Sequence, residues 1–523
     1  MLHMGVLRMI RYDLQKVKIR MGISNLNNEQ KKVKIRSVKF NAIMNTILTL
    51  SSFIFPLITF PYVSRILQPE GTGAVSFANS IVTYFTMIAS LGVPTYGIRA
   101  CSKVRDNKEE LSRTVQEILI INLVLTVLVY IAYFWAVLNI DKMHDEVVLY
   151  RIMSLTIILN VIGVDWLYRG LEQYSYITIR SIAFKILALI LMFLFVHEKS
   201  DYVVYGAITI VAGTGSNIFN LINLRKHIYL YPVKYYNLKK HLKPILVFFA
   251  MSVATTIYTN LDNVMLGFMT NQTEVGYYDA AVKIKNILVT IVTSLGPVLL
   301  PRATYYIEHG QMDEFKRLIK KAYHFVWILG VPVMLYFMIM ARESIFLISG
   351  KAYGGSIIPM QIIMPTVLLI GLSNVLGIQI LLPLGKEHLV FISEVAGAVV
   401  DLIINAALIP KWGASGAALG TLAAEMVVLI VQIWALRNQG FGLFKSVQVW
   451  KILTAAGLST LLCVYGKYLC GGILPIDGIV SWFLTLTATA VLFFLCYAMV
   501  LAAAKENLFI EVVQSVWNKI RGR

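Results

Sequence analysis

Charged residues are scarce in this 523-residue chain, and their scarcity excludes an ordinary soluble fold. Only 14% of the residues are Asp, Glu, Lys or Arg, whereas a soluble domain carries roughly 25%. Apolar residues make up 58% of the chain, and the mean hydropathy is +0.71. So apolar a composition over this length indicates a protein that crosses a membrane many times.

Several kinds of chemistry are also missing. The four cysteines have no spacing typical of metal ligands, so we predict no metal site. No glycine-rich loop of the GxxxxGK[ST] type occurs, which excludes ATP as the direct energy source. No loop is long enough to fold as a catalytic domain. We therefore predict a membrane transporter without catalytic residues, not an enzyme.

Apolar stretches of about 20 residues, the length that spans a bilayer, recur about fourteen times. Lys and Arg gather on the cytoplasmic side of such proteins. With a cytoplasmic N-terminus, about 36 of the 47 Lys and Arg fall in inside segments and about 6 in outside loops. The net charge of +19 therefore indicates orientation and not nucleic-acid binding. We predict a multi-pass protein of the bacterial cytoplasmic membrane with both termini in the cytoplasm.

One sequence pattern occurs twice, about 203 residues apart, as in transporters built from duplicated halves. Its copies are Glu70, Gly73, Ser90–Gly92, Pro94 and Arg99–Ala100, and Glu274, Gly276, Ser294–Gly296, Pro297 and Arg302–Ala303. Each repeat would hold six helices, an even number, so the halves should run parallel. We predict an all-α membrane protein with two six-helix lobes in a parallel pseudo-twofold repeat and a C-terminal helix pair. Chance recurrence of Ser-Leu-Gly, a common string in membrane helices, is the alternative.

The expected spans and loops divide the chain into six parts. These are a basic cytoplasmic tail (1–39), the N-lobe (40–224), a basic cytoplasmic linker (225–242), the C-lobe (243–436), the helix pair (437–504) and a cytoplasmic tail (505–523). The longest expected outer loop, 342–356, is short. A membrane polysaccharide polymerase should carry a large periplasmic loop, so this enzyme is the less favoured interpretation.

Five segments carry a family resemblance. They are Pro61–Gly73 (PYVSRILQPEGTG), Leu91–Arg99 (LGVPTYGIR), Asp165–Arg180 (DWLYRGLEQYSYITIR), Asp262–Gly276 and Ile409–Ala418 (IPKWGASGAA). In these segments the chain resembles the Wzx-type O-antigen and polysaccharide repeat-unit flippases of the multidrug, oligosaccharidyl-lipid and polysaccharide exporter superfamily. The resemblance implies a V-shaped, two-lobed transporter whose central cavity alternately faces the two sides of the membrane.

The resemblance also implies a cargo and partners. The cargo would be an oligosaccharide on undecaprenyl diphosphate, flipped to the periplasmic leaflet with a proton or sodium gradient as energy source and no bound cofactor. Membrane lipids and other polysaccharide assembly proteins would be its partners, and nucleic acid would not. A multidrug or toxin exporter and a peptidoglycan-precursor flippase of the same superfamily stay open as alternatives.

Cationic residues inside the spans are candidates for the substrate cavity, because a diphosphate cannot cross about 30 Å of hydrocarbon unaided. Lys283, Lys285 and Lys185 lie about two turns into their spans. Lys283 and Lys285 are about 200° apart on a helix, so only one of them can face a given cavity. Arg65, at the expected outer end of the first span, is the fourth candidate. Snorkelling to the interface is the alternative for all four.

Two further arginines occupy equivalent positions in the repeats. Arg99 and Arg302 lie at the expected cytoplasmic ends of their spans, where a guanidinium would bind the arriving headgroup through its phosphate oxygens. Plain positive-inside anchoring is the alternative. Asp165 and Arg169 are four residues apart, and we expect them to form a local ion pair.

Acidic residues within the spans are candidates for ion coupling, because a buried carboxylate can exchange a proton or hold a cation. Asp401, Glu425 and Asp262 fall well inside their expected spans. Glu394, Asp401 and Asn405 share one helix face and form a polar stripe. A structural pair or a hydrogen bond between helices is the alternative for each of them.

Overall fold

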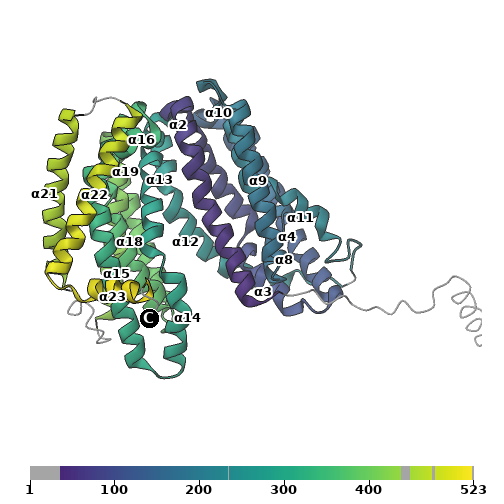
Figure 1. The fold of residues 1–523 in the computed structure, drawn as a ribbon. Coiled ribbons are helices and arrows are strands. Elements are labelled where there is room, and N and C mark those ends of the chain that lie inside the picture. Colours follow the sequence, from purple (N-terminus) through teal and green to yellow (C-terminus); the bar gives the residue numbers. More distant parts are fainter. Residues whose placement is uncertain (1–35, 234, 438–447, 474–477, 521–523) are drawn as a thin grey trace, which may run out of the picture.

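The structure, a computed structural model, describes residues 36–520 apart from 234, 438–447 and 474–477. All regular elements within these residues are helices (Figure 1). The expected all-α fold is therefore confirmed for the described part of the chain. Residues 1–35 of the expected basic tail lie outside it.

The helices of the first half run from the first span to the expected linker. They are α2 (Val38–Ser90), α3 (Val93–Val104), α4 (Lys108–Asn139), α5 (Asp141–His144), α6 (Val147–Met153), α7 (Leu155–Ile162), α8 (Asp165–Gly170), α9 (Tyr174–Phe195), η1 (Lys199–Asp201), α10 (Tyr202–Ile210), η2 (Val211–Gly215) and α11 (Asn217–Leu224). We call this group the N-lobe.

The second half is helical to a similar extent. It contains α12 (Lys239–Met269), α13 (Gln272–Thr293), α14 (Gly296–Glu308), α15 (Met312–Ile339), α16 (Ala341–Ser349), η3 (Lys351–Ser356), α17 (Ile357–Ile363), α18 (Thr366–Asn374), η4 (Val375–Leu381), α19 (Glu387–Leu436), α21 (Val449–Ile473), α22 (Ile479–Ala503) and α23 (Asn507–Ile520). We call α12 to α19 the C-lobe.

Eleven helices of the described chain are long and apolar enough to cross a membrane, or twelve if a pair bent by 44° forms one span. Two of them are far longer than one crossing needs, because α2 has 53 residues and would extend about 80 Å if straight. It breaks at Gln68, where φ is 61°, and α19 breaks at Gly413, where φ is 51°. Each broken helix therefore has two arms. The expected count of about fourteen spans stays a prediction.

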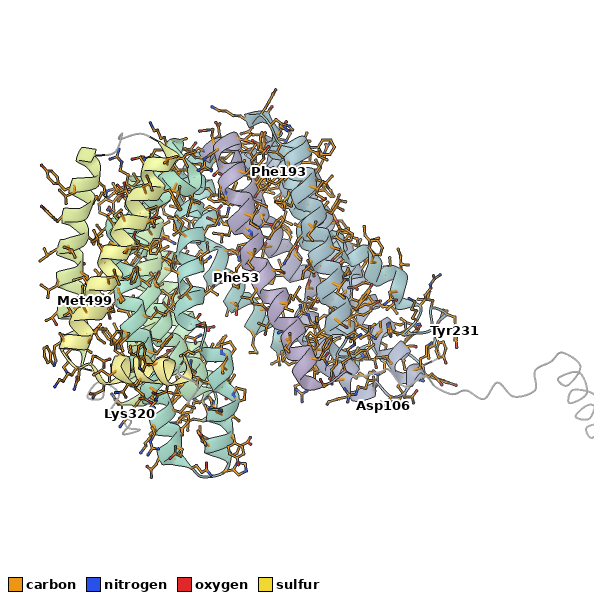
Figure 2. The ribbon with its side chains drawn as sticks, in the orientation of Figure 1. Phe53, Asp106, Phe193, Tyr231, Lys320 and Met499 are labelled. Carbon is orange, nitrogen blue, oxygen red and sulfur yellow. The ribbon has the colours of Figure 1, made fainter. Side chains whose placement is uncertain are left out.

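The helices form two groups that meet at one end of the molecule and diverge toward the other (Figure 1). Phe193 marks the end where α2, α10 and α16 come together, and Asp106 and Lys320 mark the opposite end (Figure 2). Asp106 and Lys320 lie in segments that the charge pattern assigns to one side of the membrane. Their shared position is what alternating loops require.

Both copies of the repeated pattern interrupt a helix at the same place. The first ends α2 at Ser90 and starts α3 with Pro94 in its first turn, and the second separates α13 from α14, which begins at Gly296. Proline is favoured in a first turn because its missing N–H would have no helical partner there. Gly92 has φ +72°, and a Cβ there would overlap the backbone of Phe249 on α12. Each copy of the pattern therefore ends one helix and begins the next.

The two halves touch through the glycines that the repeat pairs. A Cβ on Gly73 of α2 would overlap the carbonyl oxygen of Gln272, and one on Gly276 of α13 would overlap that of Pro69. Next to this contact, Ser76 donates to Asp279 with 2.9 Å between oxygens. Glycine allows two helix backbones to approach this closely. The lobes are therefore joined by direct backbone packing.

Helix α12 of the C-lobe also packs on the N-lobe. Its first turns pack on the N-lobe, where the buried carboxylate of Glu117 on α4 accepts from the Asn237 backbone N–H (2.6 Å), Lys240 Nζ (2.7 Å) and His241 Nε2 (2.7 Å). A carboxylate can only accept, so Nε2 donates, and Nδ1 of neutral His241 accepts from the Tyr96 hydroxyl at 2.6 Å. The far half of α12 packs on α19. This helix is the covalent and packed link between the halves.

Two predicted extramembrane pieces are helical. The expected outer loop at 342–356 was wrong as a loop, because α16 and η3 occupy it and Glu343, Ile345 and Phe346 are buried. The expected tail at 505–523 contains α23, which Lys321 and Glu511 tie to α15 with 2.5 Å between charged atoms. The sequence predicted a loop and a tail at these two segments because neither segment contains an apolar run long enough to span a membrane.

We expect Glu117→Gln to destabilise the protein by about 3 kcal/mol, because the amide has no charge and only one acceptor oxygen for the three donors that Glu117 satisfies. Glu110→Gln, at an exposed position of the same helix, is the matched control. The measurement is the midpoint of thermal unfolding of the purified protein in detergent. Equal midpoints for the two variants would show that this network does not hold α12.

Candidate functional site

A partly open cavity of about 580 Å³ lies within the N-lobe, between α2, α3, α8, α9 and η2. We call it the N-lobe cavity. Its charged lining side chains are Asp165, Arg169, Arg180 and Lys185. Three cations thus share the cavity with one carboxylate, and the remaining lining is largely hydroxyl, amide and apolar groups.

A change of backbone direction between α7 and α8 brings the carboxylate of Asp165 to Arg169 and Arg180. Val164 has φ 39° and separates α7 from α8, which starts at Asp165. Oδ2 of Asp165 lies 2.7 Å from Nε of Arg169, which confirms the expected ion pair. Oδ1 lies 3.1 Å from Nη2 of Arg180 on α9. One carboxylate therefore holds two guanidinium groups from different helices.

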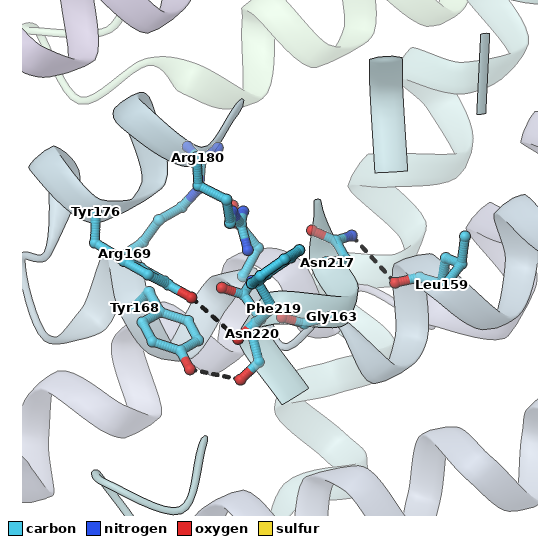
Figure 3. A network of polar contacts seen from close by, with 10 residues as sticks. Leu159, Gly163, Tyr168, Arg169, Tyr176, Arg180, Asn217, Phe219 and Asn220 are labelled. Carbon is cyan, nitrogen blue, oxygen red and sulfur yellow. Dashed lines mark hydrogen bonds and ion pairs between the residues drawn. The ribbon is translucent and has the colours of Figure 1, made fainter. Parts of the chain in front are cut away.

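The frame around these charges is fixed by side chains that bond to the backbone (Figure 3). Asn217 donates to the carbonyl oxygen of Leu159 at 3.1 Å, and Asn220 donates to that of Gly163 at 2.6 Å. Tyr168 donates to the carbonyl oxygen of Asn220 at 2.7 Å. These bonds hold α11 against α7 and α8. The cavity wall is therefore preorganised.

Lys185 enters the cavity from the middle of α9. Its Nζ donates to the hydroxyls of Ser51 and Ser52 on α2, at 2.8 and 2.9 Å. No ion pair of Lys185 with a described carboxylate is present. Its positive charge is solvated by hydroxyls and not neutralised.

A second polar group lies inside the C-lobe, around a cavity of about 150 Å³ between α12, α13 and α19. We call its four charged residues, Asp262, Lys285, Asp401 and Glu425, the C-lobe polar cluster. Asp262 accepts from Asn405 Nδ2 at 2.6 Å, from the Thr421 hydroxyl at 3.0 Å and from the Tyr278 hydroxyl. Asp262 therefore joins three helices.

The other members of the cluster are less fully paired. Tyr258 donates to Oε1 of Glu425 at 2.5 Å. Asp401 is only 2% exposed, and its Oδ1 has no hydrogen-bond partner among the described residues. Lys285 is buried opposite these acids. Three acids and one lysine make the interior of the C-lobe acidic, whereas that of the N-lobe is basic.

Where the lobes meet, a third and mainly apolar cavity of about 230 Å³ lies between α2, α13 and α16. Lys283 lines it and pairs with Asp279 at 2.6 Å. Its Nζ also lies 3.8 Å from the centre of the Phe60 ring. Lys283 is therefore neutralised and held at the contact between the lobes.

Residues 38–307 match the family described as "Polysaccharide biosynthesis protein", which is more than half of the chain. The chain belongs to this family. The sequence is 26% identical over 404 residues to the "Putative O-antigen transporter" of Escherichia coli (strain K12), a match that covers 77% of this chain and 97% of that protein. The predicted family resemblance is confirmed.

Solved structures show the same fold as this family member. The similarity to "Lipid II flippase MurJ, inward closed conformation" has a TM-score of 0.71 at 14% identity and covers 89% of this chain and 100% of that one. An inward-facing multidrug resistance MATE family transporter of the MOP superfamily gives 0.60 at 15% identity, with 77% and 99% covered. The chain is thus a multi-pass membrane protein with a transporter fold.

In this family member, the structure separates the four lysine and arginine candidates for the substrate cavity. Lys283 and Lys285 line different cavities, as their spacing on the helix predicts. Lys185 lines the N-lobe cavity. Arg65 is turned onto backbone carbonyls, donating to Pro61 at 2.6 Å and to Leu347 of α16. It joins the lobes at the Phe193 end.

The remaining candidates fall into two groups. Asp262, Asp401 and Glu425 come together in the C-lobe polar cluster, whereas Glu394 is half-buried and outside the lining of that cavity. Arg99 on α3 and Arg302 on α14 are exposed.

Two residues of this family member escaped the sequence interpretation. Arg180 was not selected as a site residue, and Asp279 was not recognised as the partner of Lys283. The signal for Arg180 was available, because it stands among apolar residues five positions before Lys185 on the same helix. The signal for Asp279 was its position four residues before Lys283, a spacing at which opposite charges pair on a helix.

A glycine controls the shape of the C-lobe polar cluster. A Cβ on Gly420 would overlap Oδ1 of Asn405 and lie 2.8 Å from Oδ1 of Asp401. We expect Gly420→Ala to displace Asn405 from Asp262 and to lower stability by about 1–3 kcal/mol through overpacking. Gly457→Ala is the control, because a Cβ there meets nothing within 4 Å. Thermal unfolding in detergent measures both, and an unchanged midpoint for Gly420→Ala would contradict this view of the cluster.

Proposed function

We propose that the protein is a flippase that moves undecaprenyl-diphosphate-linked oligosaccharide repeat units from the cytoplasmic to the periplasmic leaflet for surface polysaccharide biosynthesis. It resides in the bacterial cytoplasmic membrane with both termini in the cytoplasm. It acts as a transporter by ion-coupled alternating access, without catalysis and without a bound cofactor. Other polysaccharide assembly proteins supply and receive its cargo.

The observation that carries this proposal is the charge inside the two lobes. A charged group at the centre of a membrane-spanning helix costs roughly 2.5–3.5 kcal/mol or more, so it is expected where it faces a polar path or a partner. The N-lobe cavity has three cations and one acid, and the C-lobe polar cluster has three acids and one lysine. The first interior suits an anionic headgroup, and the second suits a coupling cation.

The arrangement of the lobes supports alternating access. They are joined at the Phe193 end by Arg65 and by the contact of Gly73 with α13, and they diverge toward the Asp106 end (Figure 2). The positive-inside pattern assigns the diverging end to the cytoplasm. The described conformation is therefore the one that would receive cargo from the cytoplasmic leaflet. The name of the Escherichia coli relative supports an O-antigen type of cargo.

Deleting the gene in its host is the test of this function. We expect a complete repeat unit on undecaprenyl diphosphate to accumulate in the membrane, and surface polysaccharide to be lost, because the finished unit cannot cross. Mass spectrometry of lipid-linked oligosaccharides measures the first and surface polymer staining the second. Unchanged lipid-linked oligosaccharides and polymer would overturn the proposal. Altered drug tolerance would then favour an exporter, and accumulated peptidoglycan precursor a flippase for that lipid.

The C-lobe polar cluster is the proposed coupling site for a proton or sodium gradient. No group of three or more His, Cys, Asp or Glu suited to a tightly bound metal occurs among the described residues. Asp262 on α12 and Asp401 on α19 instead face one small cavity. A cation bound there would screen their repulsion and hold α12 against α19.

We therefore expect Asp262→Asn and Asp401→Asn to reduce surface polymer at least tenfold at equal expression, because the site loses its charge. Asp313→Asn, at an exposed position in the first turn of α15, is the control. A stabilising shift in thermal unfolding on replacing potassium by sodium, absent in Asp262→Asn, would identify sodium as the ion. Full polymer in both cluster variants would exclude the cluster from coupling.

A further inference from the structure

The N-lobe cavity holds more positive charge than its own carboxylate can neutralise. Arg169, Arg180 and Lys185 line it with Asp165 as the one acid in the lining, which leaves a surplus of two positive charges. Arg180 is buried at 8% exposure, whereas Arg169 is 38% exposed and Lys185 is half-buried. Burying a charge such as that of Arg180 costs several kcal/mol unless it is paired, and an anion in the cavity would offset that cost.

Arg180 is the strongest sign that a partner is missing. Its side chain is 8% exposed, and of its nitrogens Nη2 bonds to Asp165 at 3.1 Å. Nε and Nη1 are buried and have no hydrogen-bond partner among the described residues. Its guanidinium carbon lies 5.6 Å from the centre of the Tyr176 ring. An interior guanidinium with two unused donors is poised for a further acceptor.

The carboxylate of Asp165 lies where an anionic ligand of Arg169 and Arg180 would bind. It divides its two oxygens between Arg169 and Arg180, and so gives each guanidinium a single short contact. A phosphoryl group offers more oxygens, and guanidinium binds them bidentately. An incoming phosphate would therefore satisfy donors that Asp165 leaves unused.

Cations enter the cavity from two levels of α9, as suits a ligand with two linked phosphoryl groups. Arg180 and Lys185 are five residues apart on α9, a rise of about 7.5 Å. Lys185 is held toward the cavity by two serine hydroxyls, and Asn160 and Asn217 add polar groups to the wall. The volume of about 580 Å³ lies within the roughly 300–1,000 Å³ of small-molecule sites.

We propose that the N-lobe cavity is a diphosphate-binding site formed by Arg169, Arg180 and Lys185, and that Asp165 is a built-in counter-ion which the diphosphate displaces. The inference rests on the proposed function only in naming the lipid-linked cargo as the source of the diphosphate. The surplus of two charges is matched by the charge of a diphosphate group. Without ligand, Asp165 keeps the two arginines in place.

Binding to the purified full-length protein in detergent tests the site. The probes are geranyl diphosphate, inorganic diphosphate and glucuronate, and isothermal titration calorimetry measures the affinity for each. We expect Arg180→Gln to weaken geranyl diphosphate binding at least tenfold and Arg180→Lys to weaken it less. Arg151→Gln is the matched control, since Arg151 is exposed on α6 and outside the cavity lining. Glucuronate binding without diphosphate binding would overturn the proposal.

Asp165→Asn separates a counter-ion from a merely structural ion pair. If diphosphate displaces Asp165, removing its charge frees both arginines, and binding becomes at least threefold tighter. A structural pair predicts equal or weaker binding. The proposal is overturned if Asp165→Asn binds no tighter than the wild type, or if Arg180→Gln and Arg151→Gln bind alike. The comparison of Asp165→Asn with the wild type does not require that Arg180→Gln folds.

A complementation assay keeps this inference apart from the proposed function. The deletion host is supplied with the wild type or with Arg180→Gln, and surface polymer is measured at equal expression. Full polymer with both overturns the site and leaves the flippase function standing. If diphosphate binds as predicted but no lipid-linked oligosaccharide accumulates in the deletion host, the site is supported. The proposed flippase function is then overturned.

Discussion

A carboxylate buried among lipid-facing helices has to find its donors inside the protein, because hydrocarbon offers none. Three acids, of which Glu117 is fully buried and Asp165 and Asp262 are partly buried, show how this requirement decides which helices pack together. Glu117 ties α4 to the start of α12, Asp165 ties α8 to α9, and Asp262 ties α12 to α13 and α19. Apolar packing alone distinguishes poorly between lipid and a neighbouring helix. These polar contacts therefore specify the bundle.

The same requirement makes α12 the element that couples the lobes. One end is held in the N-lobe through Glu117 and His241, and the other in the C-lobe through Asp262. A rigid rotation of one lobe against the other must bend this helix or break one of the two networks. The occupancy of the acidic cavity around Asp262 can therefore influence the position of the N-lobe. The physical link is a helix with two separate anchors.

The contact between the lobes is of a different kind. Gly73 and Gly276 bring the backbones of α2 and α13 together, and the neighbouring polar contacts are few and short, such as Ser76 with Asp279. Packing through small residues lets helices approach without interlocking long side chains. Such a surface suits a joint about which two rigid halves rock. The charged interiors then lie on either side of the joint.

The sequence by itself determined the membrane fold, the family and the duplicated helix break. Composition and span length are averages over many residues, and the Ser-Leu-Gly pattern with its proline acts locally, at Gly92 as at Gly296. The sequence also predicted the separation of Lys283 from Lys285, because helix geometry alone decides it.

Only the tertiary structure decided which charges share a cavity. Asp262, Lys285 and Asp401 lie on three separate helices. The sequence assigned Lys285 to the substrate cavity and the two acids to ion coupling, whereas packing places all three around one space. Arg180 became a site residue through Asp165, which a backbone break turns toward it. The partner of Arg65 across the lobes is the carbonyl oxygen of Leu347 on α16, a segment that the sequence assigned to a loop. Periodicity fixes the direction of a side chain about its own helix, but the partners that it meets depend on how the helices cross.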